Sequence, residues 1–215
     1  YIMDLTGRTP EKIAAAMPKD GRRGVKRAER VAKEAGVVIK DETGMDRATF
    51  DEVYRVLEET SERDGFTPHS ADVYWTMLTT LGEQARMYVA RLDGRPVAWV
   101  LVTVNGISSV AYYGASTTAD RATRAAEATD WYAACDLAAK GYKGYDFMGA
   151  GSTRVPELYS VGMYKKRFAQ HPTEVDGAWD VPVQRPVFEA LVAAKKAKHL
   201  VRKATVVAAK ASEAI

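Results

Sequence analysis

Two dipeptides constrain the fold of this chain more than any other feature of its sequence. Asp93-Gly94 and Asn105-Gly106 each separate two runs of mostly apolar residues. Asp-Gly and Asn-Gly between such runs are the strongest short signals for a β-hairpin, because the tight turn needs residues that tolerate a positive φ. The sequence therefore predicts an antiparallel meander of three strands, at residues 87–91, 96–104 and 107–116.

Helices are predicted on both sides of this meander. Before it, cap residues and apolar residues at the 3.6-residue period indicate helices near residues 10–17, 20–35, 46–64 and 70–81. After it, we expect helices at about 121–140 and 156–169, and a last helix that begins at Pro186. Further strands are predicted at residues 1–5, 37–39, 145–148 and 174–183. Antiparallel strands followed by a strand–helix–strand crossover indicate an α+β fold whose sheet is mixed and mainly antiparallel.

The stretch from Gly141 to Phe168 is the strongest candidate for a site. Its strand at 145–148 ends in a turn with Gly149 and Gly151, where the missing Cβ lets backbone and ligand approach closely. The helix after it carries Tyr164-Lys165-Lys166-Arg167-Phe168, in which two aromatic residues at i,i+4 spacing flank three cations. Such a strand, turn and basic helix favour the binding of an anionic or polar acyl donor.

Basic residues are concentrated at the two ends of the chain. Residues 1–40 hold 10 Lys and Arg against 5 Asp and Glu, and residues 186–215 hold 6 against 2. The middle holds 15 against 21, so it is acidic although the whole chain carries a net charge of +3. This distribution suggests a polyanionic partner or an anionic membrane face, and ordinary solvated helix faces are the alternative.

Composition argues against several classes of protein. The lone Cys135 rules out an internal disulfide and fits a reducing compartment, so we expect a cytoplasmic protein. Three isolated His and one Cys give no metal-ligand spacing, and we expect no metal. The longest apolar run, residues 96–104, is too short to cross a bilayer, which needs about 20 residues. Because residues 1–5 have the pattern of a strand, the chain is expected to be a piece of a longer protein.

Several short motifs occur in an order that resembles one known family. They are Tyr1 to Leu5, Arg22-Arg23-Gly24-Val25-Lys26-Arg27-Ala28, Glu62-Arg63-Asp64-Gly65-Phe66, Tyr113-Gly114-Ala115-Ser116, Asp146-Phe147-Met148-Gly149 and Tyr164-Lys165-Lys166-Arg167-Phe168. The order of predicted elements resembles an N-acetyltransferase-like (GNAT-like) domain. The motifs resemble those of the Fem family (FemABX), the aminoacyl-tRNA-dependent peptidyltransferases that build peptidoglycan cross-bridges. The resemblance extends from residue 1 to about residue 185.

This resemblance implies that the chain corresponds to the second GNAT-like domain of such a protein. Residues 1–40 would then be a strand and basic helix that lead in from an upstream domain. Residues 41–185 would form the acyltransferase domain, and residues 186–215 a C-terminal basic helix.

The implied activity is that of an aminoacyltransferase. An amine of a peptidoglycan stem peptide would attack the ester that joins an amino acid to the 3′ end of tRNA, with aminoacyl-tRNA as co-substrate and no cofactor. Lys165 matches the family's lysine and would stabilise the tetrahedral oxyanion, with Tyr164 as the matching aromatic beside it. Because no paired nucleophile and base stand out in the sequence, we expect direct aminolysis in which positioning supplies much of the acceleration.

The expected acceptor is a UDP- or lipid-linked muropeptide, which carries a diphosphate. Arg23, Lys26 and Arg27, near a predicted helix start, could hold that diphosphate, and a solvated basic face is the alternative. Further candidates for substrate binding are Tyr113, Gly114, Asp146 and Gly149. A packing role for Tyr113 and a capping role for Asp146 remain open.

Two other functions remain open. An acyl-CoA-dependent N-acyltransferase would want a glycine-rich loop before a helix N-terminus, and residues 121–126 contain no glycine. A non-catalytic domain that binds tRNA or muropeptide would need no catalytic lysine. The basic residues from Lys195 to Lys203 could attract tRNA or the anionic inner face of the membrane.

Overall fold

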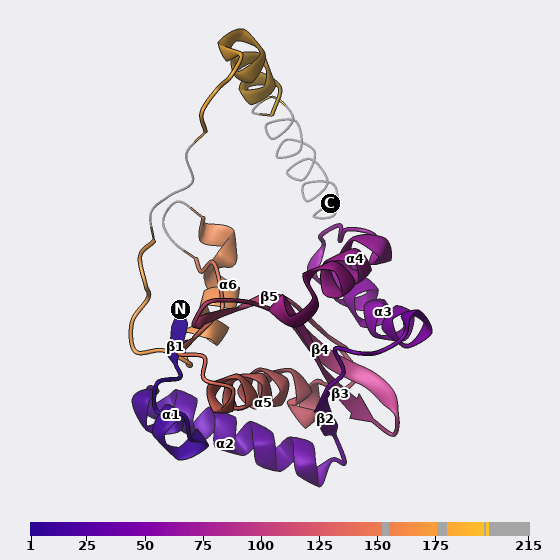
Figure 1. The fold of residues 1–215 in the computed structure, drawn as a ribbon, viewed down its shortest axis with the longest axis vertical. Coiled ribbons are helices and arrows are strands. Elements are labelled where there is room, and N and C mark those ends of the chain that lie inside the picture. The colour runs from indigo at the N-terminus through magenta and orange to yellow at the C-terminus, as the bar shows by residue number, and fades with distance from the viewer. Residues whose placement is uncertain (152–154, 176–179, 196, 198–215) are drawn as a thin grey trace, which may run out of the picture. The chain divides into compact units, whose positions relative to one another are not determined.

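The computed structural model describes residues 1–151, 155–175, 180–195 and 197, and the chain divides into two compact units, 1–173 and 174–215. The first unit contains a six-stranded sheet (Figure 1). Its strands are β1 (Ile2–Asp4), β2 (Val38–Asp41), β3 (Ala85–Leu92), β4 (Arg95–Asn105), β5 (Ser108–Ser116) and β6 (Gly144–Asp146). Its α-helices are α1 (Pro10–Ala16), α2 (Lys19–Glu34), α3 (Arg47–Asp64), α4 (Ala71–Leu81), α5 (Ala125–Ala139) and α6 (Tyr159–Lys165).

The sheet is mixed and mainly antiparallel, as predicted. Its order is β1-β6-β5-β4-β3-β2, and only β5 and β6 run parallel to each other. Helix α5 joins these two strands, which is the crossover that a parallel pair requires. Both hairpins form where the dipeptides predict them, and Gly94 and Gly106 have φ values of +80° and +57°.

Strand β4 lies at the centre of the fold and is buried on both faces. Val100, Val102 and Val104 pack with α5, α1 and α2 side chains, whereas Trp99 and Leu101 pack with residues of α3 and α4. Alternate residues of a strand point to opposite faces, so the two sets belong to two cores. Figure 1 shows the corresponding arrangement, with α1, α2 and α5 along one face of the sheet and α3 and α4 on the other.

Two predicted helices are interrupted near the site. The helix expected at 121–140 consists of a 3₁₀ turn at Arg121–Thr123 and then α5, because Arg124 between them has a left-handed backbone with φ 57°. The helix expected after Pro156 begins as a 3₁₀ turn, Pro156–Leu158, and continues as the short helix α6.

The strand predicted at residues 174–183 is wrong for the residues that the structure describes. Residues 174, 175 and 180–183 are not in a strand, and residues 176–179 lie outside the described part. The predicted range contains Pro182, which has no N–H to contribute to a sheet.

In the second unit, residues 185–195 are helical, which agrees with the predicted C-terminal helix in that range. Arg185 pairs with Glu189 one turn later on this exposed helix. Most of the basic segment from 195 to 203 lies outside the described residues. Within the described part of the chain, no helix has the length and apolar character needed to cross a membrane.

Candidate functional site

The candidate site arises from the divergence of β5 and β6. These strands pair only at three positions, where residues 108–110 face residues 144–146. Strand β5 then continues to Ser116 with β4 as its partner on the other side. A cavity of about 940 Å³ opens beside this second half of β5, and residues of α3, α5 and α6 complete its wall.

A β-bulge shapes β5 where the cavity begins. Leu101 faces Tyr113 and Val102 faces Ala111, so Tyr112 is an extra residue without a partner in β4. Bulges are frequent next to active sites because they redirect the side chains that follow. Here Tyr112 and Tyr113 pack edge to face with centroids 4.8 Å apart, and Tyr113 also meets Tyr74 of α4 at 4.7 Å.

Lys165 lies in the cavity wall at the end of α6 and is half-buried. Its Nζ donates a hydrogen bond of 2.6 Å to the carbonyl oxygen of Gly149, in the turn after β6. Burial lowers the pKa of Lys165, while the negative charges of Asp146 and Asp130 act against this shift. The site therefore contains an ammonium group that is hydrogen-bonded to a backbone carbonyl at the cavity wall.

The carboxylate of Asp130, on α5, also lines the cavity and joins three elements. It accepts hydrogen bonds from the hydroxyl of Tyr164 on α6, at 2.6 Å, and from that of Tyr145 on β6, at 2.9 Å. Burial raises the pKa of Asp130 to about 6, although both hydrogen bonds favour the charged form. The two tyrosines have pKa values well above the ordinary value, mainly through burial and then through Asp130.

The start of α5 brings further charge to the wall. Arg124, in its left-handed conformation, turns its guanidinium onto Glu127, which is only 7% exposed. Oε1 of Glu127 is buried and makes no hydrogen bond with any described residue. Arg121 and Arg167 also line the cavity, and neither has an ion pair within the described part of the chain. Both arginines are exposed.

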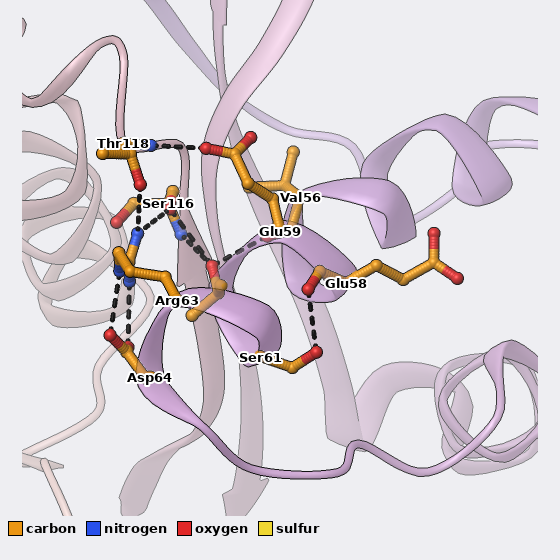
Figure 2. Close-up of polar contacts among 9 residues, drawn as sticks. Val56, Glu58, Glu59, Ser61, Arg63, Asp64, Ser116 and Thr118 are labelled. Atoms are coloured by element: carbon orange, nitrogen blue, oxygen red, sulfur yellow. Dashed lines mark hydrogen bonds and ion pairs between the residues drawn. The ribbon is translucent and has the colours of Figure 1, made fainter. Parts of the chain in front are cut away.

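A polar network attaches the end of β5 to α3 (Figure 2). Arg63 donates to the carbonyl oxygen of Ser116 at 2.7 Å and, as a fork, to both carboxylate oxygens of Asp64. Glu59 accepts a hydrogen bond of 2.7 Å from the backbone N–H of Thr118. The hydrogen bonds from Arg63 lower the pKa of Asp64. This network fixes the loop that leads from β5 to α5 along the cavity.

The structure brings together part of the predicted site. Lys165, Tyr164, Tyr113 and Gly114 all line the cavity. Gly149 is exposed beside it and is bonded to Lys165 through its carbonyl oxygen.

Asp146 and Gly151 have visible structural roles in this region. The Asp146 carboxylate accepts a hydrogen bond of 2.7 Å from the backbone N–H of Met148, as a capping residue does. At Gly151, a Cβ would lie 2.5 Å from the backbone of Tyr159, so the close approach there is to helix α6. A Cβ on Gly149 would meet only ordinary contacts.

Arg23, Lys26 and Arg27 lie elsewhere. All three are exposed on α2, and none of them is among the residues that line the cavity. Their assignment to a diphosphate remains a prediction that concerns the surface of α2.

Sequence reasoning missed Asp130, Arg121 and the pair formed by Arg124 and Glu127. One signal was present in the sequence. Glu127 and Asp130 are three residues apart in an alanine-rich helix, and an acid on the apolar face of a helix is rarely buried without a partner. The tyrosine partners could not be paired with Asp130 from the sequence, since they come from β6 and α6.

The fold and this cavity define an acyltransferase domain of the GNAT type. The family model described as "Acetyltransferase (GNAT) domain" matches residues 19–166, which is more than half of the chain, and the chain belongs to this family. No curated protein matches the sequence.

Solved structures share the fold at low sequence identity. FemX has a TM-score of 0.67 at 16% identity, and the match covers 78% of this chain and 57% of FemX. The C-terminal domain of a putative lysylphosphatidylglycerol synthetase from Agrobacterium fabrum has a TM-score of 0.54 at 15% identity, covering 78% of this chain and 51% of that chain. An aminoglycoside acetyltransferase from an uncultured soil metagenomic sample, solved with sisomicin, has a TM-score of 0.52 at 14% identity. The match covers 68% of this chain and 96% of that chain.

Proposed function

We propose that this domain transfers an amino acid from aminoacyl-tRNA to the stem-peptide amine of a peptidoglycan precursor, as in cross-bridge formation. The observation that carries the proposal is Lys165, an ammonium group half-buried in the cavity wall and hydrogen-bonded to the Gly149 carbonyl. The similarity of the fold to that of FemX, at 16% sequence identity, also favours aminoacyl transfer over other acyl transfers in this proposal.

In the proposed reaction the amine attacks the ester carbon and the carbonyl oxygen becomes an oxyanion. Lys165 exchanges its bond to the Gly149 carbonyl for a bond to this oxygen, which carries more negative charge in the transition state than in the substrate. The low-dielectric wall strengthens that interaction compared with water.

The transfer is direct in this proposal. Neither Cys nor His occurs among the described residues that line the cavity, and in this proposal the attacking group is the substrate amine itself. Holding amine and ester in contact can supply about 7–11 kcal/mol through effective molarity.

The proposed partners are polyanions. Arg121 and Arg167 face the cavity and suit the phosphates at the end of aminoacyl-tRNA, while Arg23, Lys26 and Arg27 on α2 suit the diphosphate of a UDP- or lipid-linked muropeptide. We place the reaction in the cytoplasm, with the basic C-terminal segment in contact with tRNA or with the anionic inner face of the membrane.

A second candidate is transfer from acyl-CoA, which the family match itself favours. The start of α5 lies at the cavity and could receive a pyrophosphate. However, the turn before α5 is occupied by Arg124, whose side chain is already paired with Glu127. This arrangement makes acyl-CoA the weaker candidate.

One assay distinguishes the candidates. The 215-residue chain is incubated with a muropeptide acceptor and either radiolabelled aminoacyl-tRNA or radiolabelled acetyl-CoA. We expect label in the acceptor from aminoacyl-tRNA. Label from acetyl-CoA alone would establish the second candidate, and binding of tRNA or muropeptide without product from either donor would indicate a non-catalytic binding domain.

A further inference from the structure

The direct transfer leaves one chemical requirement without an assigned residue. As the C–N bond forms, the amine nitrogen becomes positively charged and has to lose a proton before the ester can break productively. Lys165 cannot serve as both the positive group at the oxyanion and the acceptor of that proton. The proton must therefore go to another group, and an ionised carboxylate in the described wall near Lys165 would suit this role.

Four acidic residues line the cavity, and three of them are engaged in ion pairs. Asp64 is held by Arg63, Asp120 by Arg95 and Glu127 by Arg124. Asp130 has no ion pair with a described residue and is bonded only to neutral hydroxyls there. A carboxylate bonded to neutral donors keeps more affinity for a proton than one paired with a guanidinium.

The geometry at Asp130 leaves room for a substrate. The tyrosines bond to different oxygens, Tyr145 to Oδ1 and Tyr164 to Oδ2, so each oxygen retains a lone pair. Asp130 belongs to the cavity wall and is only partly buried as a residue. Tyr164 precedes Lys165 in α6, so the proton acceptor and the cation are held by adjacent residues of one helix.

We propose, on the basis of the function proposed above, that Asp130 accepts the proton of the attacking amine. The amine forms its bond to the ester carbon, and its nitrogen gives one proton to an oxygen of Asp130. The bond between that carbon and the 3′ oxygen of the tRNA ribose then breaks, and the proton moves from Asp130 to the departing oxygen. Asp130 is ionised again at the end, and no other reactant is needed.

The titration of Asp130 suits this role. Its charged form is opposed by burial and by Glu127, and favoured by Tyr164, Tyr145 and Lys165, and its pKa is raised to about 6. General bases work best when their pKa lies near the working pH, where the charged form predominates and still holds a proton well.

The test is the pH dependence of kcat/KM for transfer from aminoacyl-tRNA to muropeptide, between pH 4.5 and 8.5. For the wild-type chain we expect a break near pH 6, below which the rate falls more steeply. Asp130→Asn should lower kcat by about 100- to 10,000-fold, the usual contribution of a general base, and should abolish the break. Circular dichroism checks that the variant is folded.

A second variant tests the proton acceptor even if Asp130→Asn fails to fold. Tyr145→Phe removes one hydrogen bond that favours the charged carboxylate, so the break should move to higher pH. A purely structural role of Tyr145 would change the rate without moving the break. Asp136→Asn is the matched control, since Asp136 is on the same helix and accepts from Tyr88 at 2.7 Å but is not in the cavity wall. It should keep both the rate and the break.

The outcomes separate this inference from the proposed function. If the wild-type chain transfers from aminoacyl-tRNA but Asp130→Asn keeps its rate, or Tyr145→Phe keeps the break at the wild-type pH, Asp130 is not the proton acceptor. If the wild-type chain transfers nothing from aminoacyl-tRNA, the proposed function is wrong and this assignment is wrong with it.

Discussion

In the proposed reaction, the ammonium of Lys165 exchanges one oxygen acceptor for another. Its hydrogen bond to the Gly149 carbonyl positions the ammonium, and an oxyanion offers a stronger acceptor at the same place. We expect Lys165→Met to lower kcat about 100- to 1000-fold, as the loss of one oxyanion donor typically does. The measurement is a single-turnover rate of amino-acid transfer.

Lys166→Met is the control for this prediction. Lys166 follows Lys165, is exposed, and is not in the cavity wall. It should retain most of the wild-type rate. Equal losses in the two variants would mean that the positive charge of the segment matters and that the position of Lys165 does not.

Asp130 also predicts a pH dependence of stability. Its pKa is about 6 in the folded protein against an ordinary 3.8, so the folded state binds more protons between these values. Its contribution to the unfolding free energy must therefore decrease as the pH rises from about 4 to about 6. This rise of the pKa corresponds to a cost of roughly 3 kcal/mol above pH 6.

Denaturant unfolding of the wild-type chain and Asp130→Asn at pH 4.5 and 7.5 measures this cost. Relative to the variant, the wild type should be less stable at pH 7.5 than at pH 4.5. The same difference at both pH values would show that Asp130 does not titrate in this range.

The residues at the site were predictable to the extent that they follow one another in the chain. The Tyr164–Phe168 segment and the Tyr113–Ser116 strand end could be singled out because each is a local motif. Asp130 could not be singled out, because its position in the site depends on hydrogen bonds from Tyr145 and Tyr164, which are 15 and 34 residues away in the sequence.

At the scale of elements, two glycines of α2 are expected to behave differently. A Cβ on Gly21 would lie 1.6 Å from the backbone oxygen of Arg167, whereas a Cβ on Gly24 would meet the end of the Glu127 side chain at 2.8 Å. Backbone cannot move aside cheaply, so Gly21→Ala should cost about 3 kcal/mol. For Gly24→Ala, the better helix propensity of alanine should offset most of the contact and leave the change within about 1 kcal/mol.

Urea unfolding of both variants measures this contrast. Similar changes for the two substitutions would mean that α2 does not approach the segment after α6 as closely as the structure shows.

The contact between α3 and β5 gives another prediction. Thr60 of α3 is 6% exposed, and its hydroxyl accepts from the backbone N–H of Ser116 at 3.1 Å. Thr60→Val removes that acceptor and should destabilise the protein by about 1–3 kcal/mol, the cost of a buried polar group left unpaired. Thr79→Val on the exposed face of α4 should change stability by less than about 0.5 kcal/mol. Thermal unfolding of the pair checks this, and a loss in Thr79→Val as large as in Thr60→Val would contradict it.

The sequence predicted most elements because their signals are local. The hairpin dipeptides and the N-caps Thr9 and Asp46 act within a few residues, and each forms as expected. The break at Arg124 has no such signal, since arginine does not favour a positive φ. What accompanies that conformation is its ion pair with Glu127.

At the scale of the whole molecule, the uneven charge predicts how binding depends on salt. Residues 186–215 hold 6 Lys and Arg against 2 Asp and Glu. A chain that ends at residue 185 should bind tRNA more weakly, and its log Kd should vary less steeply with log salt concentration, because fewer counterions are released. Fluorescence anisotropy at several salt concentrations measures both, and unchanged slopes would show that this segment does not contact the nucleic acid.

The short parallel pairing has a consequence for recognition. Past Val110, no strand in the described part of the chain pairs with β5 on the side where β6 leaves it. The N–H and C=O of Ser116 are already bonded to Thr60 and Arg63, but we expect main-chain groups of residues 111–115 to lie along the cavity, where an extended guest chain could bind them as an inserted strand. Selection of a guest would then depend on its backbone as well as its side chains, and an N-methylated or proline-containing peptide would be rejected for want of a donor.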